Sequence, residues 1–81
     1  MKIYWYNGRK NIIGSNVRQL RRKAKLTQEQ LAARLQVSGY ELDRLAIVRI
    51  EAGDRFIADY EVKALAIALS VNIEILYEED N

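Results

Sequence analysis

Amide, hydroxyl and guanidinium side chains supply the candidate chemistry of this chain, and several of them lie in or near the run Leu26–Ala32. Thr27 is a good helix N-cap, because its side-chain oxygen can accept a hydrogen bond from a first-turn N–H, and Gln28 then lies at the exposed helix start. A second run, Arg49–Gly53, ends on a glycine where a left-handed C-cap is wanted. The chemistry that these groups support is hydrogen bonding to another molecule.

The apolar residues beside these groups indicate how the two helices meet. Leu31 and Leu35 lie four residues apart on one helix face, and Ala32 is small enough for another helix to cross closely. Two short crossed helices joined by a turn, the first starting at a polar amide, are typical of a helix-turn-helix that reads DNA.

Catalysis is not expected from this composition. The 81 residues include no cysteine and no histidine, which excludes disulfides, thiolate or imidazole metal sites and histidine-based catalysis. Since no glycine-rich phosphate loop or spaced set of carboxylates is present, we expect no enzyme, no metal and no cofactor. The longest apolar run, Ala64–Leu69, is far shorter than the ~20 residues of a membrane span, and no signal peptide is visible. We therefore expect a cytoplasmic protein with no membrane partner.

The charge is polarised along the chain, although its net value is only +2. Residues 37–81 carry four bases and ten acids, a net charge of −6. Residues 1–36 have a net charge of +8, from Glu29 and nine bases: Lys2, Arg9, Lys10, Arg18, Arg21, Arg22, Lys23, Lys25 and Arg34. A run such as Arg21–Lys23 is often only a solvated helix face. Beside a helix-turn-helix pattern, the polarised charge favours a positive face for DNA.

Helical spacing of apolar residues predicts an all-α bundle of five short helices. One apolar stripe comprises Ile13, Val17, Leu20 and Ala24, and a later one comprises Val62, Leu65, Ala66 and Leu69. The helices are expected at about 12–24 and 28–36, then one ending at Gly53, one starting after a loop at 54–58, and one from 73 to about 78. The expected N-caps of the first, fourth and fifth helices are Asn11, Asp59 and Asn72.

The start of the third helix has two candidates. Ser38 with Glu41 fits a capping box, whereas an Asp43 cap would place Arg44 in the first turn. We favour Asp43, because the Ser38 cap would project Glu41 at the DNA phosphates. Gly39 is then a permissive turn residue.

In this order, the following residues resemble the Cro/repressor-type (XRE) helix-turn-helix family: Ile13-Gly14, Val17-Arg18, Leu20-Arg21, Leu26-Thr27-Gln28, Leu31-Ala32, Leu35, Ile47, Ile50-Glu51, Gly53, Arg55, Leu65-Ala66 and Leu76. The match covers roughly residues 13 to 77, and the combination of Thr-Gln with a later Ile-Glu-x-Gly is fairly specific. The resemblance implies a compact five-helix, lambda-repressor-like DNA-binding domain. Such proteins are usually dimeric repressors or regulators in bacteria or phages.

The resemblance also implies roles for single residues. Gln28 matches the amide that the family uses to grip a phosphate, and Arg21 and Glu51 match an internal ion pair, which we prefer to a DNA role for Arg21. The base-reading positions fall on Arg44, Leu45 and Ala46. The expected contacts to the DNA backbone are completed by Lys25, Thr27, Arg49 and Arg55.

Two features depart from the family pattern. The chain between Leu35 and Asp43 is a few residues longer than the commonest spacing, and Gln36 holds the usual place of the turn glycine. The reading positions carry Arg-Leu-Ala where polar residues are typical. Arg44 can contact guanine through two hydrogen bonds and Leu45 or Ala46 can touch a thymine methyl, but none of the three offers hydrogen-bond readout of adenine.

The terminal segments are expected to flank a domain at 12–78, with an extended arm at 1–11 and an acidic tail at 79–81. Asn7-Gly8 after an aromatic run is a hairpin-turn signal. We expect Trp5 and its neighbours to cover a side of the bundle or a subunit interface; the alternative is a basic-aromatic arm that touches DNA.

The pattern therefore predicts a sequence-specific DNA-binding transcriptional regulator, a repressor that inserts its third helix in the major groove of double-stranded DNA. A homodimer is expected through Ile75 and Tyr77, because Ile73 and Leu76 suffice to anchor the fifth helix. The alternative is that Tyr4 and Trp5 fold over Ile75. The alternative function is a protein-interaction module, docking a partner through Leu45 and Val48, or an antitoxin-like protein that binds both DNA and a partner.

Overall fold

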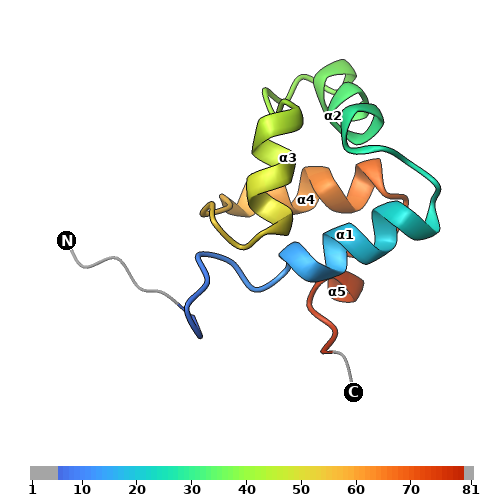
Figure 1. Cartoon of the computed structure of the whole chain (residues 1–81). Helices are drawn as coiled ribbons and strands as arrows, with labels where there is room; N and C mark the ends of the chain where they lie inside the picture. Colours follow the sequence, from blue (N-terminus) through green and yellow to red (C-terminus); the bar gives the residue numbers. More distant parts are fainter. Residues whose placement is uncertain (1–5, 80–81) are drawn as a thin grey trace.

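The computed structural model describes residues 6–79, and all the regular secondary structure in this part of the chain is α-helical (Figure 1). The five helices are α1 (Gly14–Lys23), α2 (Gln28–Val37), α3 (Arg44–Glu51), α4 (Asp59–Ala68) and α5 (Ile73–Leu76). The expected all-α, five-helix fold is confirmed. None of these helices is long and apolar enough to cross a membrane.

The core lies where α3 packs against α1 and α2, and α4 packs against α2 and α5. Aliphatic side chains from all five helices are buried in it, and each contributes ~1.5–3 kcal/mol by leaving water. The apolar stripe predicted for α4 is entirely buried. The largest fully buried side chains are Ile13, Val17, Leu31, Leu35, Leu42, Ile47, Ile50, Leu65 and Leu76.

A capping box starts α2, as Thr27 predicts. The Thr27 hydroxyl oxygen accepts from the Gln30 N–H at 3.0 Å, and the Gln30 side-chain oxygen accepts from the Thr27 N–H at 2.8 Å. Helix α2 then ends at Val37 with Ser38 as its C-cap, and Gly39 turns the chain with a φ of +92°. Gly39 is thus the permissive turn residue that was expected.

The longer turn between α2 and α3 has its own anchor in the core. Leu42 is buried and Tyr40 packs against the core from the side. The Asp43 carboxylate then accepts from the Ala46 N–H at 2.9 Å, so α3 starts with Asp43 as its N-cap. Ser38 is instead the C-cap of α2. The preference for Asp43 is confirmed.

The end of α3 follows the prediction for Gly53, whose φ is +75°. The Gly53 N–H donates to Ile50 O at 3.0 Å, and the Asp54 N–H donates to Arg49 O at 2.8 Å. These two bonds form a Schellman motif, which requires a left-handed residue at this position.

The starts of α1 and α4 differ from the prediction. Helix α1 begins at Gly14 rather than at 12, with Ile13 as its N-cap, and the predicted cap Asn11 lies two residues earlier. The Asn11 side-chain oxygen nevertheless accepts from the Gly14 N–H at 2.8 Å. Asp59 is the first residue of α4 rather than its cap, because Glu61 reaches back to accept from the Ala58 N–H at 2.9 Å.

Two expectations for α5 are wrong, its end and its anchoring by Ile73. Asn72 is the N-cap residue, as predicted, although its side chain makes no capping bond, and the helix ends at Leu76 rather than near residue 78. Leu76 is fully buried, but Ile73 is 40% exposed and does not anchor the helix on the bundle. In so short a helix, neighbouring packing decides which side faces the core.

The predicted turn at Asn7-Gly8 is present. Both residues have positive φ, and the main chains of Tyr6 and Arg9 exchange hydrogen bonds of 2.8 and 2.9 Å. This is the geometry of a tight hairpin turn. The roles expected for Tyr4 and Trp5 lie outside the described residues.

Gly14 permits the close approach of α1 to α3, and Gly14→Ala should destabilise the fold by ~1–3 kcal/mol. A Cβ at this position would clash with the main-chain oxygen of Ile50 and approach the Asn11 side-chain oxygen to 2.8 Å. The control is Ser15→Ala at the exposed neighbour. Urea unfolding should give a lower midpoint for Gly14→Ala than for the control, and equal midpoints would contradict the packing argument.

Candidate nucleic-acid interface

An ion pair between α1 and α3 organises the site. Arg21 Nε and Nη2 donate to the two carboxylate oxygens of Glu51 at 2.7 and 3.0 Å. Both residues are almost out of water, with exposed fractions of 8% and 6%. The family resemblance implied this pair, and the structure contains it. Two parallel hydrogen bonds of this kind hold two helices in a defined relation.

The surroundings of the pair satisfy the remaining polar atoms. Arg21 Nη1 donates to Leu26 O at 2.7 Å, and the Gln28 amide donates to a Glu51 carboxylate oxygen at 3.2 Å. Hydrogen bonding to Glu51 raises the pKa of Arg21 above its ordinary value, although burial acts in the opposite direction. Arg21 therefore remains a cation in the folded domain, and its Nε, Nη1 and Nη2 atoms each donate to a partner inside the protein.

Gln28 connects this internal network to the surface. It is the first residue of α2 and is half-buried, with one amide donor directed at Glu51. A glutamine amide has two N–H donors, so a second remains for another partner. The predicted phosphate-binding amide is thus joined directly to the end of α3.

The exposed face of α3 is formed by Arg44, Leu45, Val48 and Arg49, of which only Val48 is half-buried. Leu45 is 61% exposed, an unusual position for a large apolar side chain. Positions 44, 45, 48 and 49 lie together on one side of an α-helix, because residues three and four apart share a face. We name these four residues the α3 outer face.

Ala46 does not belong to the α3 outer face. It is half-buried and packs against the core, so the structure turns it away from the position expected of a base-reading residue. Val48 takes the place in the middle of the face, and the base-reading prediction did not include it. The signal was available in the spacing, since Val48 lies four residues after Arg44.

The predicted backbone-contacting residues have different surroundings. Lys25 and Arg49 are exposed, and Lys25 has a φ of +60° in the turn before α2. The Thr27 oxygen is engaged in its capping bond. Arg55 pairs with Glu61 at 3.0 Å and also donates to Phe56 O at 3.1 Å. The structure therefore gives Arg55 an internal partner that the sequence did not predict.

The Arg55–Glu61 pair also affects the start of α4. Partial burial acts to raise the pKa of Glu61, but hydrogen bonds from Arg55 and from the Ala58 N–H outweigh it and hold the pKa below its ordinary value. Glu61 therefore stays ionised at neutral pH. It ties the loop after α3 to the first turn of α4.

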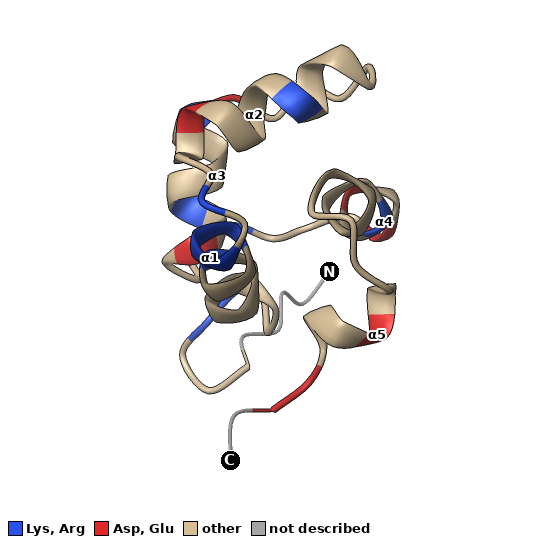
Figure 2. Cartoon of the chain, turned by 90° about the vertical axis from the view of Figure 1, so that its right-hand side faces the viewer, with Lys and Arg blue, Asp and Glu red and all other residues tan. Residues whose placement is uncertain are grey.

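The charge polarisation of the sequence is visible in the fold. In Figure 2, basic residues colour parts of α1 and α3, and acidic residues colour α5 and the segment after it. Arg18, Arg22, Lys23 and Lys25 are exposed on α1 and the following turn. An exposed basic surface of this kind on a small domain suits a polyanionic partner.

Comparison with known proteins agrees with this architecture. The family model described as "Helix-turn-helix" matches residues 17–76. Among solved structures, the chain is similar to the restriction-modification controller protein C.AhdI from Aeromonas hydrophila, with a TM-score of 0.70 and 31% identity, covering 79% of this chain and 86% of that chain. No curated protein matches the chain.

The fold and the family match over residues 17–76 define the class of this protein. It belongs to the XRE-type helix-turn-helix family, as its resemblance to Cro/repressor-type proteins predicted. The chain is a DNA-binding protein of the transcription-regulator class.

Glu51→Ala should destabilise the protein by ~3–5 kcal/mol, since it leaves the buried Arg21 cation without its counterion. The matched control is Glu41→Ala at an exposed position, which should stay within ~0.5 kcal/mol of the wild type. Urea melts of the three proteins make the comparison. If the urea midpoint of Glu51→Ala equals that of the control, the ion pair does not stabilise the fold, and Arg21 becomes a candidate DNA contact.

Proposed function

We propose that this protein is a sequence-specific repressor of transcription that inserts α3 into the major groove. The observation that carries the proposal is the α3 outer face, where two arginines flank two apolar side chains at the solvent side of an eight-residue helix. An α-helix fits the major groove, where each base pair has a distinct pattern of donors, acceptors and methyl groups.

The side chains of this face support a defined readout. Arg44, in the first turn of α3, can donate two hydrogen bonds to the O6 and N7 atoms of guanine. Leu45 and Val48 can touch thymine methyl groups. Arg49, one turn further along, suits a phosphate. A site read in this way combines guanine with thymine and contains no adenine contact through a side-chain amide of α3.

The start of α2 supports the contacts to the DNA backbone. The second N–H of Gln28 and the hydroxyl of Thr27 are donors, and Lys25 adds a positive charge just before them. A phosphate is also favoured at the positive end of a helix dipole. Arg55 can add a further contact only if it leaves Glu61, so we rank it last.

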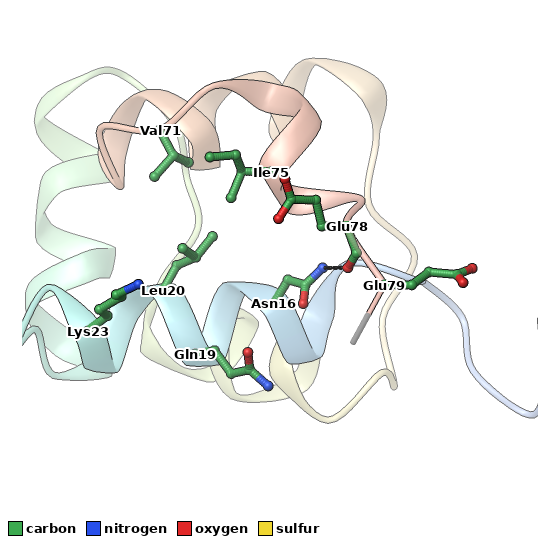
Figure 3. Close-up of a pocket in the computed structure, with 8 residues that line it drawn as sticks. All are labelled: Asn16, Gln19, Leu20, Lys23, Val71, Ile75, Glu78 and Glu79. Atoms are coloured by element: carbon green, nitrogen blue, oxygen red, sulfur yellow. Dashed lines mark hydrogen bonds between the residues drawn. The ribbon is translucent and has the colours of Figure 1, made fainter. Parts of the chain in front are cut away.

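A homodimer formed through α5 would place two α3 helices on one DNA site. Figure 3 shows Leu20, Val71 and Ile75 facing one another in a hollow between α1 and the C-terminal part of the chain. Ile75 is half-buried there, and the neighbouring Tyr77 is 48% exposed. A two-fold interface would pair these residues with their copies and set the two α3 helices roughly 34–36 Å apart, one turn of DNA.

The biological role is proposed from the likeness to a controller protein. At 31% identity over most of both chains, the similarity to a restriction-modification controller favours control of restriction-modification genes. Repression would follow where the dimer covers a promoter. A reporter gene behind the selected binding site tests the direction of regulation.

A protein-interaction module is the competing function, because Leu45 and Val48 could dock a partner instead of a base edge. The dependence of duplex affinity on salt separates the two. DNA binding releases condensed counterions, so affinity falls steeply as salt rises. Absence of duplex binding at low salt would contradict the regulator proposal.

Arg44→Ala should remove ~1–3 kcal/mol of discrimination at one base pair while leaving non-specific binding largely intact. Binding sites are first selected from random duplexes with the wild-type protein, and single-base variants then compete for each protein. Arg49→Ala is the matched control, with a uniform loss on all sequences and a salt slope smaller by about 1. If Arg44→Ala behaves as Arg49→Ala does, Arg44 is a phosphate contact.

Ile75→Asp should convert the dimer to a monomer, because a carboxylate at the two-fold would be buried without a partner. Sedimentation equilibrium measures the change. Ile67→Asp is the matched control, since Ile67 is 62% exposed on α4 and outside the hollow lined by Ile75. A wild type that is monomeric at high micromolar concentration defeats the proposal, as does an Ile75→Asp variant that still dimerises.

A further inference from the structure

Residues 9–11 bind the C-terminal end of α3 through three hydrogen bonds. Arg9 Nη2 donates to Glu51 O at 3.3 Å, Asn11 Nδ2 donates to Ile50 O at 3.1 Å, and the Lys10 main-chain N–H donates to Gly53 O at 2.8 Å. We name residues 9–11 the clasp. The last carbonyls of a helix have no partner within it. The Schellman turn supplies a donor to Ile50 O, and the clasp adds a second donor to Ile50 O and one to Glu51 O.

Asn11 is the central residue of the clasp because its amide bonds to three different parts of the fold. Its Nδ2 also donates to Arg55 O at 2.9 Å, in the loop after α3. Its Oδ1 accepts from the Gly14 N–H at 2.8 Å, at the start of α1. One half-buried side chain therefore joins the start of α1, the end of α3 and the following loop.

Arg9 adds a packing contact to the same helix end. A Cβ on Gly53 would lie 2.5 to 2.7 Å from Nε, Cζ and Nη2 of Arg9, so the guanidinium occupies the space that a side chain would need. A cation at this end of α3 also interacts favourably with the negative end of the helix dipole. Gly53 is thus required for two reasons: it allows the left-handed turn, and its lack of a side chain leaves space for the Arg9 guanidinium.

A helix as short as α3 depends on such contacts for its orientation. It has eight residues, and helices of this length are not stable without tertiary contacts. Base readout requires side chains held within ~0.5 Å and 10–20° of the productive geometry. Asp43 holds the first turn of α3, and the clasp holds its last turn.

We propose that the clasp orients α3 for base readout and that Asn11 is its positioning residue. This inference rests on the proposed function, in which α3 reads bases, and adds a specificity-determining residue that does not touch DNA. The N-terminal segment thereby acts on DNA recognition through the C-terminal end of α3.

The test is Asn11→Asp, a substitution of nearly equal size. The aspartate keeps an acceptor for the Gly14 N–H but loses both donors, and it directs an oxygen at Ile50 O and Arg55 O. With each lost bond worth about fivefold, the ratio of specific to non-specific DNA affinity should fall about fivefold for one bond and up to about 25-fold for both. The ratio is measured at a temperature at which circular dichroism shows every variant to be folded.

The matched control is Arg34→Gln, which also removes a side-chain bond to a distant carbonyl. Arg34 Nη1 donates to Ala68 O at 3.0 Å, and this bond links α2 to α4 rather than to α3. Loss of its charge changes specific and non-specific affinity alike, and the ratio should therefore stay at the wild-type value. An equal fall in both variants would make Asn11 a merely structural residue and overturn the proposal.

A second readout does not involve DNA. Hydrogen exchange of the amides of residues 52–54 should accelerate at least about fivefold in Asn11→Asp, with the α4 amides unchanged. Folded Asn11→Asp with wild-type exchange and discrimination would overturn the proposal. A wild type without sequence preference would instead refute the proposed function, and the exchange rates alone would then decide whether Asn11 holds α3. If Asn11→Asp does not fold, Arg9→Ala takes its place. The ratio of specific to non-specific DNA affinity should then fall about two- to fivefold, and an unchanged ratio would contradict the clasp.

Discussion

Two charges almost removed from water, Arg21 and Glu51, constrain the arrangement of the first three helices. A charge with 8% or 6% exposure is costly to bury unless it is paired and fully hydrogen-bonded. The short bonds between the two side chains meet this condition only when α1 and α3 lie in one relative position. Leu26 and Gln28, which complete the hydrogen bonds, then define the turn into α2. The order of α1, α2 and α3 in space follows from satisfying these buried polar atoms.

The same constraint explains which side of α3 is left for recognition. Ile47 and Ile50 enter the core, and Glu51 meets Arg21, so these three side chains take up the inner side of the helix. The Schellman turn at Gly53 and the bonds from residues 9–11 hold its last turn. What remains exposed is the α3 outer face. The residues of this face are therefore determined by how the inner side of α3 is held. The burial of Leu42 anchors the longer turn between α2 and α3 in the core.

Local patterns predicted local features well. Thr27 and Asp43 are the caps that their side chains favour, Gly39 and Gly53 adopt positive φ, and the Asn7-Gly8 pair forms its tight turn. These features depend on bonds between residues a few positions apart, which a sequence contains directly. The Arg21–Glu51 pair spans 30 positions and was predicted only because the family resemblance implied it.

Features set by packing between distant segments could not be predicted in the same way. The family resemblance placed Ala46 among the base-reading residues, but contacts with the core place Ala46 inward. Helix α5 is a single turn, so its neighbours decided that Leu76 is buried and Ile73 exposed. Asn11 looked like a cap for its own helix, yet its amide reaches Ile50 and Arg55, some 40 positions away. The sequence by itself determined the helix-turn-helix class, the helix ends at Thr27, Asp43 and Gly53, and the polarised charge, because these follow from local chemistry and composition. Only the tertiary structure decided which side chains line the outer face of α3 and what holds its last turn, because these depend on donors and apolar surfaces that meet only in the folded chain.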